Sequence, residues 1–246
     1  DNYGKGKNYL EVCDNAKGEN SDKASEVARG IRKIISGKKK FFALEYPCHS
    51  PEEKRWFRMR VTPFRGEGPY AAVIAHENIT ERKLAEEKIK YFSFHDQITG
   101  LYNRRYFENE LKRLNQSRKY PVSIIVGDLD GLKDINDSYG HRMGDKYIKK
   151  AGEVFDSITR EEDIIARIGG DEFAVILPKT DPKTVENFCS RLKGKCKWYN
   201  RKNELPRSLN ISLGWATAKN SSQDLNEIFK KADHNMYENK GRSCRK

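Results

Sequence analysis

The first third of the chain shows one helical pattern followed by three strand-like patterns. Apolar residues recur every three or four positions in residues 21–36, which predicts an amphipathic helix that Gly37 ends. Apolar and polar residues then alternate or cluster over residues 41–46, 56–63 and 70–76, with Pro- and Gly-containing turns between them. Residues 1–80 are therefore predicted to form a helix on a thin antiparallel sheet.

Residues 80–95 are rich in Glu, Lys and Arg and carry a narrow apolar stripe. Ala85, Ile89 and Phe92 are four and then three residues apart, which is the spacing of a coiled-coil seam. Because two heptads are too short to be stable alone, a dimer formed here needs support from the flanking domains. Residues 81–95 are therefore predicted to be a helical, coiled-coil-like linker.

The remainder of the chain, residues 96–246, alternates between helical and strand patterns. A Gly-Gly pair at 169–170 between two apolar runs predicts a β-hairpin. Such alternation is typical of an α/β domain with a mixed sheet. Helices are expected over 106–114, 147–158, 185–198 and 225–237, and strands over 122–128, 164–168, 173–177 and 209–216.

Composition excludes some classes and leaves others open. Mean hydropathy is −0.89, and no apolar run approaches the ~18 residues of a membrane span. The net charge of +12 invites a nucleic-acid or anionic-membrane role, but it is spread evenly: residues 1–80 carry +4 and residues 81–246 carry +8. A DNA-associated regulator therefore has no clustered basic face or recognition motif to support it. No nucleic-acid partner is predicted.

The cysteines bear on the cellular location of the chain, and the first residue bears on whether the chain is a fragment. Five cysteines without a C-x-x-C pair argue against a disulfide framework or a structural zinc site. Reduced thiols fit a cytoplasmic location. Since the chain begins at Asp1 without an initiator Met, we expect it to be a fragment of a longer protein.

Two acidic segments follow apolar strand patterns. Asp128 and Asp130 end a strand two residues apart, so alternation points them the same way, either to cap a turn or to bind a metal. Asp171 and Glu172 follow Gly-Gly at the tip of the hairpin. Mg²⁺ typically takes one or two carboxylates plus substrate phosphates. Asp128 and Asp171 on adjacent strand ends would supply such a pair.

Six segments follow one another in order over about 150 residues: DQITGLYNRR (96–105), DLDGLKDIND (128–137), YGHRMGD (139–145), GGDEF (169–173), ISLGWA (211–216) and ADHNMYENK (232–240). Together they resemble the GGDEF family of diguanylate cyclases, which join two GTP molecules into cyclic di-GMP. The resemblance implies an α/β (α+β) fold for 96–246, a nucleotidyl-cyclase-like domain whose central mixed sheet is wrapped by helices.

The resemblance implies the metal site and the catalytic groups. Asp128, the backbone carbonyl of Leu129 and Asp171 would hold Mg²⁺ (or Mn²⁺) over the GTP phosphates. Asp171 with Glu172 would assist deprotonation of the attacking 3′-hydroxyl. Lys133 would neutralise charge that grows on the α-phosphate.

The resemblance also implies substrate contacts. Asn136 and Asp145 would hydrogen-bond the guanine edge, because an amide and a carboxylate supply acceptors for its N–H donors. Lys240 would meet the terminal phosphates. His141 either contacts substrate or makes structural hydrogen bonds. Whether Arg242 or Arg245 also contacts phosphate stays open.

Each domain would hold one GTP, so the resemblance implies that a homodimer performs the reaction. Arg160 and Asp163 resemble the family's R-x-x-D product-inhibition site, and Arg191 matches its secondary inhibitory arginine. A catalytically idle module that binds GTP or cyclic di-GMP as a sensor is the alternative. The intact acids at Asp128, Asp171 and Glu172 argue against it.

Residues 1–80 resemble the C-terminal part of a PAS sensory domain. The likeness rests on segments 8–13, 45–51 and 76–83. The opening strands of such a domain would precede Asp1, so autonomous ligand sensing by this chain is not expected.

Overall fold

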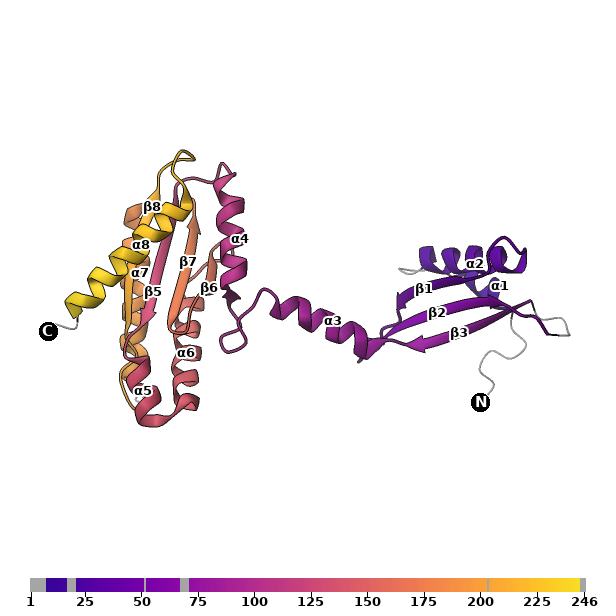
Figure 1. Cartoon of the computed structure of the whole chain (residues 1–246), viewed down its shortest axis with the longest axis horizontal. Helices are drawn as coiled ribbons and strands as arrows, with labels where there is room; N and C mark the ends of the chain where they lie inside the picture. The colour runs from indigo at the N-terminus through magenta and orange to yellow at the C-terminus, as the bar shows by residue number, and fades with distance from the viewer. Residues whose placement is uncertain (1–7, 17–20, 51, 67–70, 203, 244–246) are drawn as a thin grey trace. The chain divides into compact units, whose positions relative to one another are not determined.

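The computed structural model describes residues 8–16, 21–50, 52–66, 71–202 and 204–243. The chain divides into two compact units, Asp1–Lys88 and Ile89–Lys246 (Figure 1). We refer to them as unit 1 and unit 2.

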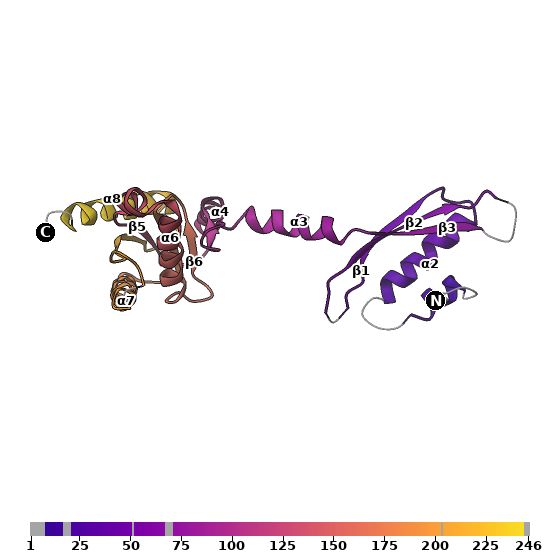
Figure 2. The same ribbon diagram turned by 90° about the horizontal axis from the view of Figure 1, so that it is seen from below.

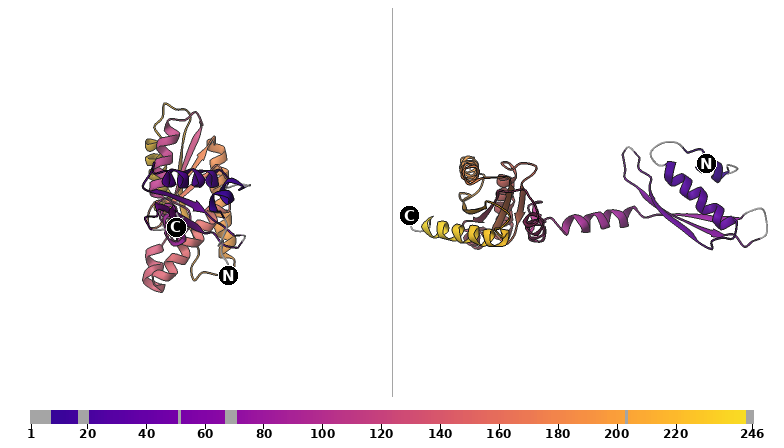
Figure 3. Two further views of the ribbon diagram at one scale, coloured as in Figure 1. Left: turned by 90° about the vertical axis from the view of Figure 1, so that its right-hand side faces the viewer. Right: turned by 90° about the horizontal axis from the view of Figure 1, so that it is seen from above.

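Unit 1 is a three-stranded antiparallel sheet of order β1-β2-β3 with two helices on one face (Figure 3). Ala28 and Ile31 of the longer helix pack over Met59 and Val61 of the central strand. The predicted sheet and helix are confirmed, whereas the short first helix was not predicted. The elements are α1 (Tyr9–Asp14), α2 (Ser21–Ile35), β1 (Phe42–Pro47), β2 (Trp56–Pro63) and β3 (Ala72–Asn78).

Helix α3 (Thr80–Phe92) begins at an ion-pair cluster on the sheet. The Glu45 carboxylate of β1 accepts from Arg58 at 2.8 Å, from Arg82 at 2.6 Å and from Lys83 at 2.9 Å. Hydrogen bonds from Lys83 and Arg58 hold the pKa of Glu45 down to about 2. The first turn of α3 is therefore tied to the sheet through charge.

The rest of α3 leaves its apolar stripe open. No residue of the helix is buried, and Ile89 is 70% exposed. The helix ends at Phe92, three residues before the predicted end, because Ser93 and Phe94 turn and His95 bridges to Tyr102.

Unit 2 contains a five-stranded sheet of order β4-β6-β7-β5-β8. Strand β4 runs parallel to β6 and the other pairs are antiparallel, so the predicted mixed sheet is confirmed. All eight residues of β5 are buried. The strands are β4 (Tyr102–Asn103), β5 (Val122–Leu129), β6 (Ile164–Arg167), β7 (Glu172–Pro178) and β8 (Ile211–Ala218).

Helices cover both faces of this sheet (Figures 1 and 2). Helices α5, α6 and α7 pack on one face and α4 with α8 on the other, each face having its own apolar core. The helices are α4 (Arg104–Asn115), α5 (Leu132–Tyr139), α6 (His141–Asp156), α7 (Pro182–Asn200) and α8 (Leu225–Ser243).

The largest difference from the sequence patterns lies between β5 and α6. Residues 132–139 form a separate helix, and α6 begins at His141 rather than at residue 147. Glycines with positive φ, Gly131 at 71° and Gly140 at 80°, set off the two helices. Only Leu132 and Ile135 of α5 are buried, too few for a recognisable period.

Among the helices that the structure describes, none combines the length and apolar character needed to cross a membrane.

Gly214 of β8 provides a stability test, because a Cβ there would meet the α8 backbone at Ala232 and Met236. We expect Gly214→Ala to lower the free energy of unfolding by about 2–3 kcal/mol through overpacking. Urea unfolding followed by circular dichroism measures it. The matched control is Gly194→Ala on α7, where a Cβ meets nothing within 4 Å; helix propensity should stabilise this variant by about 0.5–1 kcal/mol. Equal stability of the two variants would contradict the packing argument.

Candidate active site

The candidate site lies where the central strand β5 ends. Asp128 is directly opposite Glu172 of β7 on one side and Ser212 of β8 on the other. Directly opposite residues of an antiparallel pair share a face, so these side chains lie on the α8 face of the sheet. Leu129 N–H donates to the Asp171 carbonyl at 2.9 Å, which fixes the hairpin beside the end of β5.

Asp128 is a nearly buried carboxylate, with 6% of the residue exposed. Lys240 of α8 places its Nζ 2.6 Å from Asp128 Oδ1. Burial raises the pKa of Asp128. The hydrogen bond from Lys240 opposes this rise, whereas the neighbouring carboxylates of Asp171 and Asp130 add to it. In turn, burial lowers the pKa of Lys240, but Asp128 and the neighbouring carboxylates outweigh that effect and leave it raised. Several carboxylates and one ammonium group therefore lie close together in a partly buried region.

The loop after β5 leads directly into α5. Asp130 Oδ1 accepts from the Ser212 hydroxyl at 2.7 Å, so Asp130 points toward β8. Gly131 is the N-cap of α5 and no side chain caps the helix, which leaves its first N–H groups for an anion. Lys133 is exposed in this first turn.

An arginine side chain forms hydrogen bonds to the backbone of the hairpin that carries Asp171 and Glu172. Arg167 Nε donates to the Gly169 carbonyl at 3.1 Å, and its Nη2 donates to the Gly170 carbonyl at 2.8 Å. Its Nη1 also pairs with Asp96 at 3.0 Å, and both side chains are largely buried.

Asp96 has further partners in its own turn. It accepts from the backbone N–H of Thr99 at 2.9 Å and from the Thr99 hydroxyl at 2.8 Å. Although burial raises the pKa of Asp96, these bonds and the Arg167 charge leave it below its usual value. The turn at the start of unit 2 is thus joined to the hairpin by Arg167.

Glu172 lies in an acidic setting. Burial raises its pKa, and Asp171, Asp233 of α8 and Asp128 raise it further. A carboxylate with a raised pKa takes up a proton more readily than an ordinary glutamate does.

The predicted guanine contacts lie on two neighbouring helices. Asn136 of α5 has a buried Oδ1 without a hydrogen-bond partner in the described structure. A Cβ at Gly144 of α6 would overlap that oxygen, so only glycine leaves space there. Asp145, the next residue, is exposed, as is His141 at the start of α6. An unpaired buried acceptor beside an open carboxylate suits a ligand that brings N–H donors.

The predicted inhibitory residues surround a tight turn after α6. Asp163 Oδ2 accepts from the Arg160 backbone N–H at 2.8 Å. The Arg160 guanidinium is exposed, with Glu162 3.8 Å away. Arg191 of α7 donates to the Ile158 carbonyl at 3.2 Å. Burial raises the pKa of Asp163, and the positive charge of Arg191 acts against this rise. These residues are brought together from α7 and the turn.

The donor set at the end of β5 fits a hard divalent cation. Asp128 and Asp171 supply carboxylates, and the Leu129 backbone supplies a carbonyl at the same end of the strand. The described residues contain no cluster of three or more His, Cys, Asp or Glu side chains for a metal. Mg²⁺ commonly completes so sparse a protein set with waters and phosphates, so the residues fit.

The sequence matches the family described as "Diguanylate cyclase, GGDEF domain" over residues 93–245. The chain belongs to this family. The match leaves residues 1–92 outside, so the PAS resemblance of unit 1 stays a prediction.

Two curated relatives and one solved structure illustrate the similarity. The probable diguanylate cyclase DgcT of Escherichia coli K12 is 32% identical over 155 residues, 61% of this chain and 34% of its own length. Diguanylate cyclase DgcS of Shewanella oneidensis is 35% identical over 156 residues, 61% of this chain and 51% of its own length. This chain thus spans about a third to a half of their length.

The solved structure is the GGDEF domain of DgcB from Caulobacter crescentus in complex with c-di-GMP. It superposes with a TM-score of 0.57 at 26% identity, covering 61% of this chain and 89% of that chain.

Arg167 and Gly144 are two residues of the site that the sequence pattern did not predict. A charged residue between an apolar strand and Gly-Gly was the available signal for Arg167. Nothing in the sequence indicates the contact between Gly144 and Asn136, because it depends on how α5 meets α6. The side chains of Arg242 and Arg245 lie outside the described residues, as does Cys244; the described cysteines are free.

Removal of the arginine should loosen the hairpin of this GGDEF domain. We expect Arg167→Ala to raise amide hydrogen exchange of residues 168–172 by about tenfold, since charge-assisted hydrogen bonds to both glycine carbonyls are lost. Exchange mass spectrometry measures it. Arg113→Ala, which removes a surface ion pair with Glu110, is the control and should leave the hairpin unchanged. Unchanged exchange in both variants would show that the hairpin holds itself.

Proposed function

We propose that this chain is a diguanylate cyclase that condenses two GTP molecules into cyclic di-GMP and two diphosphates. The observation that carries the proposal is the meeting of Asp128, Asp171, Glu172 and Lys240 at one end of the sheet, in a chain of the GGDEF family. A module that only binds nucleotide has no need of this set of acids.

Each half-reaction is a nucleotidyl transfer. The 3′-oxygen of one GTP bonds to the α-phosphorus of the other, and the bond from that phosphorus to the departing diphosphate breaks. The 3′-hydroxyl proton passes to the carboxylates of Asp171 and Glu172. The raised pKa of Glu172 supports this role. Lys133 and the open N-terminus of α5 offset charge on the phosphates.

Asp128, Asp171 and the Leu129 carbonyl would hold Mg²⁺ or Mn²⁺. When bound, this ion polarises the phosphoryl group and neutralises its charge. Lys240 adds a positive charge for the terminal phosphates, which its position beside Asp128 supports.

Guanine is selected between α5 and α6. The unpaired Asn136 Oδ1 and the Asp145 carboxylate accept from the guanine N–H groups. His141 lies exposed at the first position of α6, four residues before Asp145. Adenine lacks this pattern of donors, so it would leave the buried oxygen unsatisfied.

Two such domains must face each other, since each holds one GTP. The open apolar stripe of α3 supports a homodimer joined through this helix. Unit 1, as the C-terminal part of a PAS-like domain, would pass a signal through α3, and the charge cluster at Glu45 supports that connection. A cytoplasmic location fits a substrate drawn from the GTP pool.

The deciding experiment is incubation with GTP and Mg²⁺ followed by nucleotide separation. Wild type should release cyclic di-GMP, and both Asp171→Asn and Glu172→Gln should reduce the rate by about 10²-fold or more, because the carboxylates that take the proton are lost. Removal of Mg²⁺ with a chelator should abolish product.

The control variant is Glu238→Gln, an exposed carboxylate on α8 paired with His234, which should retain the wild-type rate. GTP binding without any cyclic di-GMP from the wild type, after removal of bound product, would identify a sensor module instead.

Product inhibition is expected at Arg160, Asp163 and Arg191. Arg160→Ala should raise the concentration of cyclic di-GMP that halves the rate by about tenfold, because a guanidinium fork for phosphate or guanine is removed. The measurement is the initial rate at increasing added product. Arg118→Ala, an exposed arginine after α4, serves as the charge control. An unchanged inhibition curve for Arg160→Ala would show that Arg160 does not bind the inhibitory product.

A further inference from the structure

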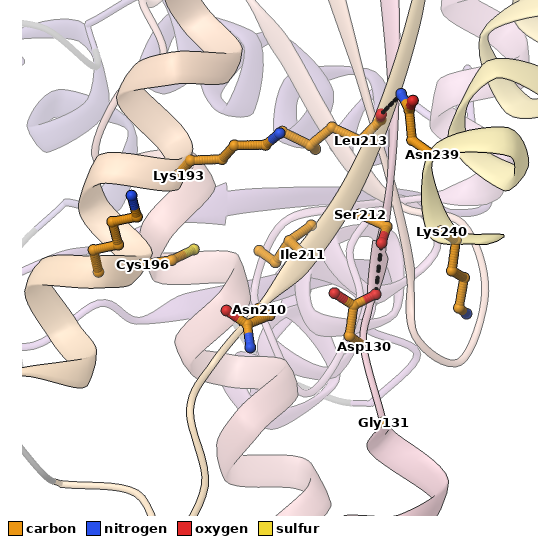
Figure 4. A pocket seen from close by; sticks show the side chains of 11 residues that line it. Asp130, Gly131, Lys193, Cys196, Asn210, Ile211, Ser212, Leu213, Asn239 and Lys240 are labelled. Atoms are coloured by element: carbon orange, nitrogen blue, oxygen red, sulfur yellow. Dashed lines mark hydrogen bonds between the residues drawn. The ribbon is translucent and has the colours of Figure 1, made fainter. Parts of the chain in front are cut away.

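A groove of about 490 Å³ lies between α7, the edge strand β8 and α8. Its walls carry Lys193 and Lys197 from α7 and Lys240 from α8. Figure 4 shows Lys193 extending from α7 toward Leu213 of β8, with Lys240 on the opposite side. Neither the metal site nor the guanine contacts described above use the two α7 lysines.

The charge of the groove is unbalanced. Asp130 is the one acidic residue among the described residues that line it, and its carboxylate already accepts from Ser212 at 2.7 Å. Lys193 and Lys197 are exposed, and neither forms an ion pair with a described carboxylate. Lysines gathered around a concave surface raise the local concentration of anions.

The groove continues from the end of β5, where Lys240 would meet the terminal phosphates of GTP. Asp130 and Gly131, which line it, follow Asp128 in the loop that leads into α5. Lys240 belongs to both places, since it lines the groove and its Nζ lies 2.6 Å from Asp128 Oδ1. An anion that leaves the end of β5 on this side therefore meets the α7 lysines next.

The lining also limits the kind of anion. None of the described lining residues is aromatic, so the groove offers no ring on which a base could stack. An extended peptide is disfavoured as well, because Asn239 and Asn235 of α8 donate to the edge carbonyls of Leu213 and Trp215, both at 2.9 Å. A small, highly charged phosphate compound fits these features.

We propose that this groove binds the diphosphate released from GTP and leads it out of the active site. The inference rests on the proposed cyclase function. When the bond between the α-phosphorus and the bridging oxygen breaks, the diphosphate keeps the bonding electron pair and its negative charge. Lys240 holds it first, and Lys193 and Lys197 then draw it away from the reacting phosphorus.

Calorimetric titration of the whole chain with magnesium diphosphate, in the absence of GTP, tests the groove. The Lys193→Ala/Lys197→Ala variant should bind about tenfold more weakly, since two charge-assisted contacts are lost. The same variant should need about tenfold more added diphosphate to slow cyclic di-GMP synthesis. The matched control is Lys183→Ala/Lys202→Ala, which removes the same charge from the start of α7 and from just beyond its end, outside the groove.

Weaker binding in the groove variant alone supports the proposal. Equal affinity of wild type and both variants overturns it, because diphosphate is then held beside Asp128 only. Equal weakening in both variants also overturns it and reduces the effect to net charge. Since this titration needs no turnover, its result is separate from whether the wild type makes cyclic di-GMP.

Discussion

Strand β5 places a carboxylate at the end of a run in which every residue is buried. A buried charge is costly unless partners compensate it, so the surroundings of Asp128 are constrained. Lys240 reaches it from α8, and the hairpin carrying Asp171 lies alongside through the bond to Leu129 N–H. Because β5 is paired on both sides, it cannot shift to relieve the crowding. The acids and the lysine stay together at one sheet end.

Other parts of unit 2 hold this arrangement in place. Arg167 ties both glycine carbonyls of the hairpin to Asp96, so the turn at the start of the unit and the acids at the site share one support. The residues predicted to contact guanine, Asn136 and Asp145, lie on α5 and α6, whereas the groove lined by Lys193 and Lys197 lies on the β8 side of the end of β5. Base and departing diphosphate would thus occupy separate regions, with the reacting phosphorus between them.

Much of this could be predicted from local patterns. The buried strand at 122–128 and the hairpin around Gly169-Gly170 follow from apolar runs and turn residues, and the structure confirms both. Helix α5 was missed because two glycines and many polar residues hide its period. Strand β4 has only two residues, which is too short to leave a pattern, and α1 buries only Cys13.

The amino-acid sequence by itself determined which carboxylates end the central strands, the mixed α/β architecture, and the family to which the chain belongs. These are properties of neighbouring residues, whose spacing is visible along the chain. Only the tertiary structure decided that Arg167 supports the hairpin, that Gly144 leaves space beside Asn136, and that Lys193 faces a groove shared with Lys240. Each of these contacts joins elements that are distant or differently oriented, and their approach is set by how helices pack on the sheet.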